Sequence, residues 1–70
     1  MKLQPIQSSN ITHAGYDPES ETARVVFKNG GAFDYSGVSQ ETFSDMVKAK
    51  SVGKFFHSNI RAKHNFKKVE

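Results

Sequence analysis

The spacing of the apolar residues changes near residue 37, and this change limits the folds that the chain can form. In residues 22–28 and 32–36, apolar and polar side chains largely alternate, as they do in strands with one buried face. In contrast, Phe43, Met46 and Val47 are three and four residues apart, which places them on one side of a helix. Strands followed by helices predict an α+β domain: a three-stranded antiparallel β-meander followed by two α-helices packed on one face.

Turn and capping residues predict where these elements begin and end. Asp17-Pro18 is typical of a turn, and Ser39 and Ser51 are suitable N-caps for two helices. The expected strands cover residues 10–17, 22–28 and 32–36, and the expected helices cover residues 40–49 and 52–65.

A chain of 70 residues forms one domain with a small core. We place this domain at residues 8–66, with a flexible leader at residues 1–7 and a basic tail at residues 67–70. Aromatic rings must supply much of such a core, so we expect Phe33 and Tyr35 inside it. The alternative is that aromatic side chains form a platform on which unpaired bases stack.

The segment Asn29-Gly30-Gly31 predicts a β-hairpin, and two registers are open to it. A two-residue turn would set Val26 opposite Phe33. A three-residue loop would set Phe27 opposite Phe33, with Gly31 in a left-handed bulge position. We prefer the three-residue loop because it gathers the apolar side chains of both strands on one face.

The second helix has one apolar side and one basic side. Val52, Phe56 and Ile60 form the apolar side, so we expect Phe56 to be more buried than Phe55. The residues Lys54, His57, Arg61 and His64 are spaced three, four and three apart and are expected to share the opposite, exposed face.

The charges are unevenly divided along the chain. Residues 1–45 contain three basic residues (Lys or Arg) and six acidic residues (Asp or Glu), which gives a charge of −3. Residues 46–70 contain seven basic residues and one acidic residue, which gives a charge of +6. The net charge of +3 is the sum of these two values. A basic segment of this kind suits a polyanionic partner, or it forms a solvated surface that keeps a small protein in solution.

Several functional classes have no support in the sequence. The chain has no cysteine, and its histidines lack the spacing of a metal site, so we expect neither a metal nor a cofactor. No nucleophile elbow or phosphate-binding glycine loop is present, so we do not expect an enzyme. With no signal peptide and no apolar run of membrane length, we expect a cytoplasmic protein that is a monomer or a weak homodimer.

Short stretches along most of the chain resemble a known family. These are Ser8-Ser9-Asn10-Ile11, Gly15-Tyr16-Asp17-Pro18, Val25-Val26-Phe27 with Gly30, Phe33-Asp34-Tyr35 with Val38, and Ser51-Val52-Gly53-Lys54-Phe55-Phe56 with Ile60-Arg61. In order and spacing they resemble the KTSC domain, which is named for its occurrence at the C-terminus of some lysyl-tRNA synthetases and is also found as small bacterial and phage proteins. The resemblance covers residues 8–66.

The sequence departs from this family's pattern at three positions. Phe33 replaces the first residue of the usual Tyr-x-Tyr pair, so any role of that hydroxyl is lost. His57 stands where the family usually has Asn, and His64 stands where it has Tyr. The resemblance implies no established activity, but its link to a tRNA-handling enzyme implies RNA binding.

These observations lead to two hypotheses. The first is a non-enzymatic nucleic-acid-binding accessory module, with RNA preferred to duplex DNA, that binds through its basic C-terminal helix. The second is a protein-interaction module that binds an acidic partner. The candidate binding residues are Lys50, Lys54, His57, Arg61, Lys63 and Tyr35.

Overall fold

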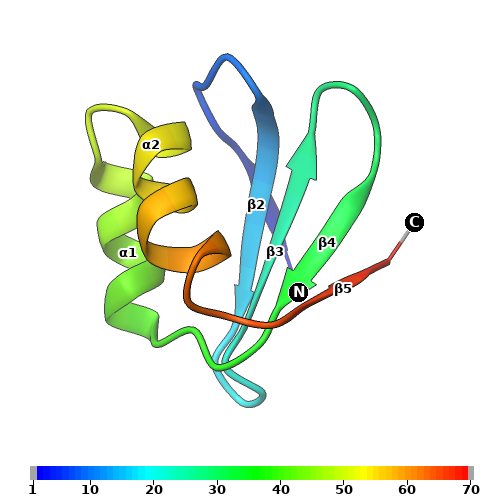
Figure 1. Cartoon of the computed structure of the whole chain (residues 1–70), viewed down its shortest axis with the longest axis vertical. Coiled ribbons are helices and arrows are strands. Elements are labelled where there is room, and N and C mark those ends of the chain that lie inside the picture. The colour runs from blue at the N-terminus through cyan, green and yellow to red at the C-terminus, as the bar shows by residue number, and fades with distance from the viewer. Residues whose placement is uncertain (1, 70) are drawn as a thin grey trace.

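A computed structural model describes residues 2–69 and shows an α+β domain built on one antiparallel sheet (Figure 1). The sheet has five strands in the order β1-β2-β3-β4-β5, and the helices lie on one of its faces. The elements are β1 (Leu3–Pro5), β2 (Ile11–Asp17), β3 (Thr22–Phe27), β4 (Ala32–Tyr35), α1 (Gln40–Lys48), α2 (Val52–Phe56), the π-helical turn η1 (His57–Arg61) and β5 (Phe66–Lys68). No helix within residues 2–69 is long and apolar enough to cross a membrane.

The prediction of an α+β domain is confirmed, but the prediction of only three strands was wrong. β1 lies in the expected leader and pairs with β2, with Leu3 opposite Gly15. β5 extends into the expected tail and pairs with β4, with Phe66 opposite Tyr35. Each of these edge strands has three residues. They are too short to show an alternating pattern, and their pairing depends on backbone hydrogen bonds that side-chain spacing does not reveal.

Both registers considered for the hairpin were wrong, because Val25 lies opposite Phe33. The backbone N–H of Phe27 donates to the Gly31 carbonyl (3.1 Å), and that of Gly30 donates to the Phe27 carbonyl (3.1 Å). The loop therefore has three residues, as preferred, but it begins at Lys28, one residue earlier than expected. Gly30 (φ 93°) and Gly31 (φ 99°) are both left-handed, so glycine content alone could not locate the bulge.

The register differs from the preferred one by two residues, and a shift of two leaves every side chain on its expected face. Ala23, Val25 and Tyr35 are buried beneath the helices. Arg24 and Asp34 lie opposite each other on the other face, where Nε of Arg24 donates to the Asp34 carboxylate at 2.7 Å.

The helices begin at the predicted N-caps. The Ser39 hydroxyl accepts from the backbone N–H of Thr42 (3.1 Å), and that of Ser51 accepts from the backbone N–H of Lys54 (3.4 Å). Each cap satisfies a backbone donor that the first helical turn leaves free.

The core lies between the sheet and the helices. Phe56 is its largest fully buried side chain, and the rings of Phe27 and Tyr35 lie against it at centroid distances of 5.6 and 5.1 Å. The predicted burial of Val52, Phe56 and Ile60 is confirmed, and Phe55 is half-buried. Tyr35 is buried as predicted, whereas Phe33 is half-buried.

Candidate functional site

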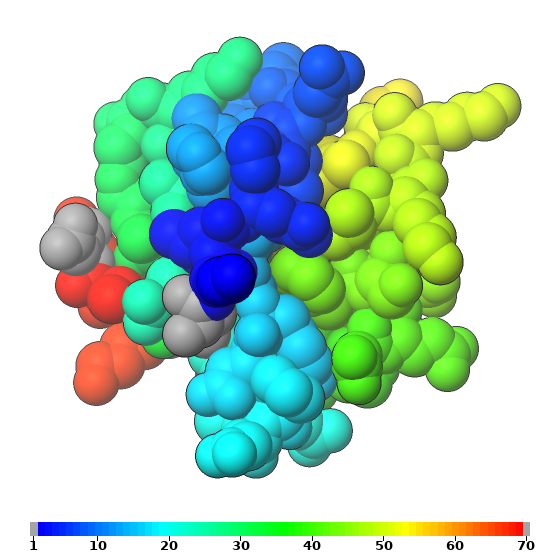
Figure 2. Space-filling view, turned by 180° about the vertical axis from the view of Figure 1, so that it is seen from behind, coloured from blue at the N-terminus to red at the C-terminus, as the bar shows by residue number. Residues whose placement is uncertain are grey.

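Lys28, in the β3–β4 loop, and Lys50, in the α1–α2 connection, lie at one end of the molecule, which we call the basic end (Figure 1). Three connections meet at this end: residues 6–10, the β3–β4 loop and the α1–α2 connection (Figure 1). Two of them are joined by a hydrogen bond from the Lys28 backbone N–H to the Asn10 carbonyl (2.8 Å). The acidic β2–β3 turn, with Asp17, Glu19 and Glu21, lies at the opposite end. Figure 2 shows it in cyan at the bottom, with the yellow residues of the α1–α2 region projecting at the upper right.

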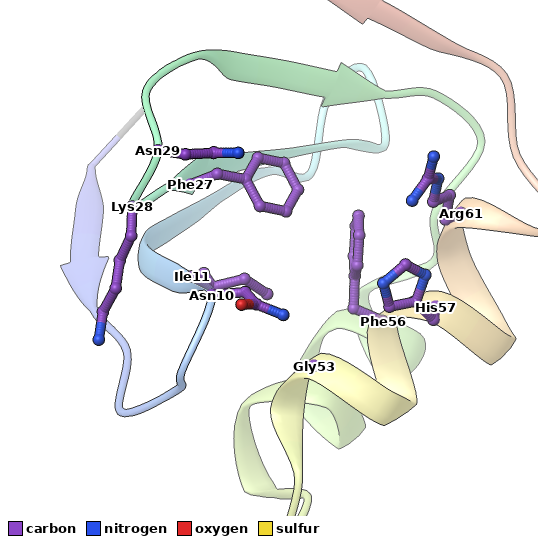
Figure 3. A pocket seen from close by; sticks show the side chains of 9 residues that line it. All are labelled: Asn10, Ile11, Phe27, Lys28, Asn29, Gly53, Phe56, His57 and Arg61. Atoms are coloured by element: carbon purple, nitrogen blue, oxygen red, sulfur yellow. The ribbon is translucent and has the colours of Figure 1, made fainter.

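Three adjoining hollows lie at the basic end and along the neighbouring helix α2 and turn η1. The central hollow, of about 340 Å³, lies between the helix and the start of β2, with Phe56 and Ile11 among its nine lining residues (Figure 3). The loop hollow, of about 580 Å³, lies between residues 7–10 and residues 50–58. The aromatic hollow, of about 350 Å³, is lined by Phe27, Asn29, Gly30, Phe33, Tyr35, Arg61 and Phe66.

The three hollows share lining residues and therefore adjoin one another on the surface. Asn10, Gly53 and His57 line both the central and the loop hollow. Phe27, Asn29 and Arg61 line both the central and the aromatic hollow. A ligand in the central hollow would therefore lie directly beside both neighbouring hollows.

Five basic side chains line these hollows, and we call them the basic set: Lys28, Lys50, Lys54, His57 and Arg61. All five are exposed, and none forms an ion pair with another residue between 2 and 69. The described lining of the three hollows contains no Asp or Glu. An uncompensated positive potential in a concave surface attracts anions.

The structure brings together five of the six candidate residues. Lys50, Lys54, His57 and Arg61 belong to the basic set, and Tyr35 lines the aromatic hollow. Lys63 is exposed but lines none of the hollows. Sequence reasoning missed Lys28, which belongs to the acidic half of the chain and joins the basic set only because the β3–β4 loop begins at this residue.

The predicted basic helix face is shorter than expected. The helix continues as the π-helical turn η1 and ends at Arg61, not near residue 65. His64 lies beyond this end, with its Nδ1 3.1 Å from the Ser36 carbonyl oxygen, so its predicted place on the face of Lys54 was wrong. π-helical turns often occur at functional sites, and here the turn carries both His57 and Arg61.

Tyr35 combines a buried ring with a hydroxyl that reaches the aromatic hollow. Its side chain is 3% exposed, and its hydroxyl forms no hydrogen bond with residues 2–69. The described part of the chain contains no fully buried, unpaired side-chain polar atom, so this oxygen is open to the hollow that Tyr35 lines. Burial raises the pKa of Tyr35 above its ordinary value of 10.0, and the Arg61 guanidinium offsets part of this rise.

The raised pKa of Tyr35 makes the domain sensitive to alkali. The folded state holds the phenol proton more tightly, so this contribution to stability is present below pH 10 and is lost as the pH rises through the folded-state pKa. We expect Tyr35→Phe to lose less stability than the wild type as the pH rises above 10. Urea unfolding at several pH values would measure the difference, and parallel stability curves would contradict it.

Residues 2–69 contain no group of three or more His, Asp or Glu side chains that is arranged to hold a metal ion. The side chains that line the three hollows offer cations, amides, hydroxyls and aromatic rings.

Comparisons with known proteins agree on one family. Residues 7–66 match the model of the KTSC domain. A protein of Tsukamurella paurometabola is 36% identical over 59 residues, which cover 84% of this chain and 88% of the relative. An uncharacterized protein of Stutzerimonas stutzeri is 33% identical over 64 residues, which cover 91% and 90% of the two chains.

A solved structure supports the same assignment. The crystal structure of a KTSC domain protein from Yersinia pestis is 32% identical to this chain, covers 99% of it and 97% of its own length, and superposes with a TM-score of 0.94. The chain therefore belongs to the KTSC domain family.

Proposed function

We propose that the protein is a non-enzymatic module that binds single-stranded nucleic acid, RNA in preference to duplex DNA, through the phosphate backbone. One observation carries the proposal: the basic set lines three adjoining hollows whose described lining contains no acidic residue to neutralise it. Lysine and arginine in such a surface replace the counterions of a phosphate backbone, and the release of these counterions drives binding.

The shape of the surface favours a single strand. Readers of duplex DNA insert a helix or a β-ribbon into a groove. Here the basic set lies around hollows, so the ligand must enter the protein, which a flexible single strand does more readily than a duplex. The occurrence of the family at the end of some lysyl-tRNA synthetases supports RNA as the strand.

Fluorescence anisotropy would test the proposal with three labelled probes: a ten-nucleotide single-stranded RNA, a tRNA and a duplex DNA. If Lys28, Lys50, Lys54 and Arg61 each neutralise one phosphate, log K should fall against log salt with a slope of about −2.8 for the single strand. Affinity should then drop about 50-fold between 50 and 200 mM salt. The absence of binding to all three probes at low salt would contradict the proposal.

An acidic protein partner would show a similar salt dependence, because the same cations would attract it. A competition experiment distinguishes an RNA ligand from an acidic protein partner. We expect unlabelled single-stranded RNA to displace the labelled RNA at a much lower concentration than polyglutamate does, when both concentrations are expressed as negative charges. Equal displacement by polyglutamate would favour the acidic-protein partner.

A further inference from the structure

Four aromatic side chains line the aromatic hollow: Phe27, Phe33, Tyr35 and Phe66. The Phe66 ring lies 5.7 Å from the ring of Phe33 and 5.7 Å from that of Tyr35, measured between centroids, and Phe27 lies 5.8 Å from Phe33. Phe66 is nevertheless 58% exposed, and Phe27 and Phe33 are only half-buried. A hollow of about 350 Å³ thus has aromatic walls that remain accessible to a ligand.

Phe66 is the most exposed large apolar side chain in the described part of the chain; Leu3 and Val69 follow at 44% and 38%. An exposed phenyl ring adds little to folding, since the hydrophobic effect stabilises a ring only to the extent that it leaves water. The position of this ring in β5 holds it over the hollow, because Phe66 pairs with Tyr35 of β4. The exposed aromatic surface is therefore fixed in place and available for stacking.

Polar groups at the rim and floor complement these rings. Asn29 and Arg61 line the aromatic hollow and also the central hollow. The Tyr35 hydroxyl opens into the aromatic hollow without a hydrogen bond to residues 2–69. Aromatic rings and guanidinium planes stack on unpaired bases, while amides and hydroxyls bind base edges.

We infer that the aromatic hollow receives one unstacked nucleobase of the strand whose phosphates lie along the central and loop hollows. This inference rests on the proposed function and adds a contact to the base, which the basic set does not supply. Arg61 lies where the two parts of the site meet, so it is placed to contact the base in the aromatic hollow or the phosphate beside it. Stacking on these rings is available to every base, so the stacking contact does not select one sequence.

The test compares a ten-nucleotide RNA with a strand of equal length and charge that carries abasic sites throughout. We expect the wild-type protein to bind the RNA at least about fivefold more tightly than the abasic strand. Phe66→Leu, which keeps apolar contact with Phe33 and Tyr35 but removes the ring, should reduce this difference by lowering the affinity for the RNA. Phe66→Trp should restore it.

The outcomes separate this inference from the proposed function. Equal wild-type affinity for both strands would overturn the base pocket and leave phosphate binding intact, whereas no binding of either strand would overturn both. If Phe66→Leu does not fold, the wild-type comparison still decides the matter. NMR of the wild-type protein offers a second readout: the Phe66 ring and the Asn29 side-chain amide should shift with the RNA and not with the abasic strand, and shifts confined to the basic set would contradict the inference.

Discussion

Phe56→Ala should destabilise the domain by about 3–5 kcal/mol, the usual cost of removing a buried phenyl ring. Phe56 is 1% exposed and is the ring that joins the helix to the sheet, with Phe27 and Tyr35 against it. A 70-residue domain has a free energy of unfolding of roughly 3.5–10 kcal/mol. The variant should therefore lose much of its stability and be partly or largely unfolded at 37 °C. Thermal unfolding followed by circular dichroism would measure the change.

Phe55→Ala is the matched control, because it removes the same side chain from the neighbouring position of the same helix. Phe55 is only half-buried, so its loss should cost clearly less than the loss of Phe56. Alanine is also a better helix former than phenylalanine, so neither change weakens the helix itself. A larger cost at Phe55 than at Phe56 would show that the core is centred elsewhere.

The buried side of this helix could be predicted because its signal is local and repeated. Val52, Phe56 and Ile60 recur every four residues, and burial follows directly from that spacing. The edge strands could not be predicted in this way. Leu3–Pro5 and Phe66–Lys68 are short and exposed, and backbone pairing with distant parts of the chain determines their place in the sheet.

The candidate site shows the same division between local and long-range information. The spacing of Lys54, His57 and Arg61 was sufficient to place them on one exposed surface. The addition of Lys28 required the position of the β3–β4 loop, and the exclusion of His64 required the point at which η1 ends. The periodicity of nearby residues predicts neither of these positions, because each depends on contacts between segments that are distant in the sequence.

Reversing two charges of the basic set, with Lys54→Glu and Arg61→Glu together, should weaken binding of single-stranded RNA by roughly 100-fold at 50 mM salt, or about 2.7 kcal/mol. Both changes replace an attraction to phosphate by a repulsion. The salt dependence should fall as well, from a slope of about −2.8 to about −1.4, because two of four phosphate contacts are lost. The anisotropy titration described above measures both quantities.

The fold should tolerate this double variant. Neither residue forms an ion pair with residues 2–69. Lys54 lies three residues after the N-cap Ser51, where glutamate favours the start of a helix. Arg61 ends η1, where a negative charge costs roughly 0.3–1 kcal/mol, so the two effects on stability oppose each other.

Lys2→Glu with Lys48→Glu is the matched control for charge. Each double variant changes the net charge by four units, from +3 to −1, and each places one glutamate at the C-terminal end of a helix, at position 48 or position 61. Lys2 and Lys48 line a separate hollow that shares no residue with the three hollows of the site. Because long-range attraction depends on net charge, both variants should lose some affinity, and only the site variant should lose about 100-fold. Equal losses would mean that RNA responds to the overall charge of the protein and not to the surface that the basic set lines.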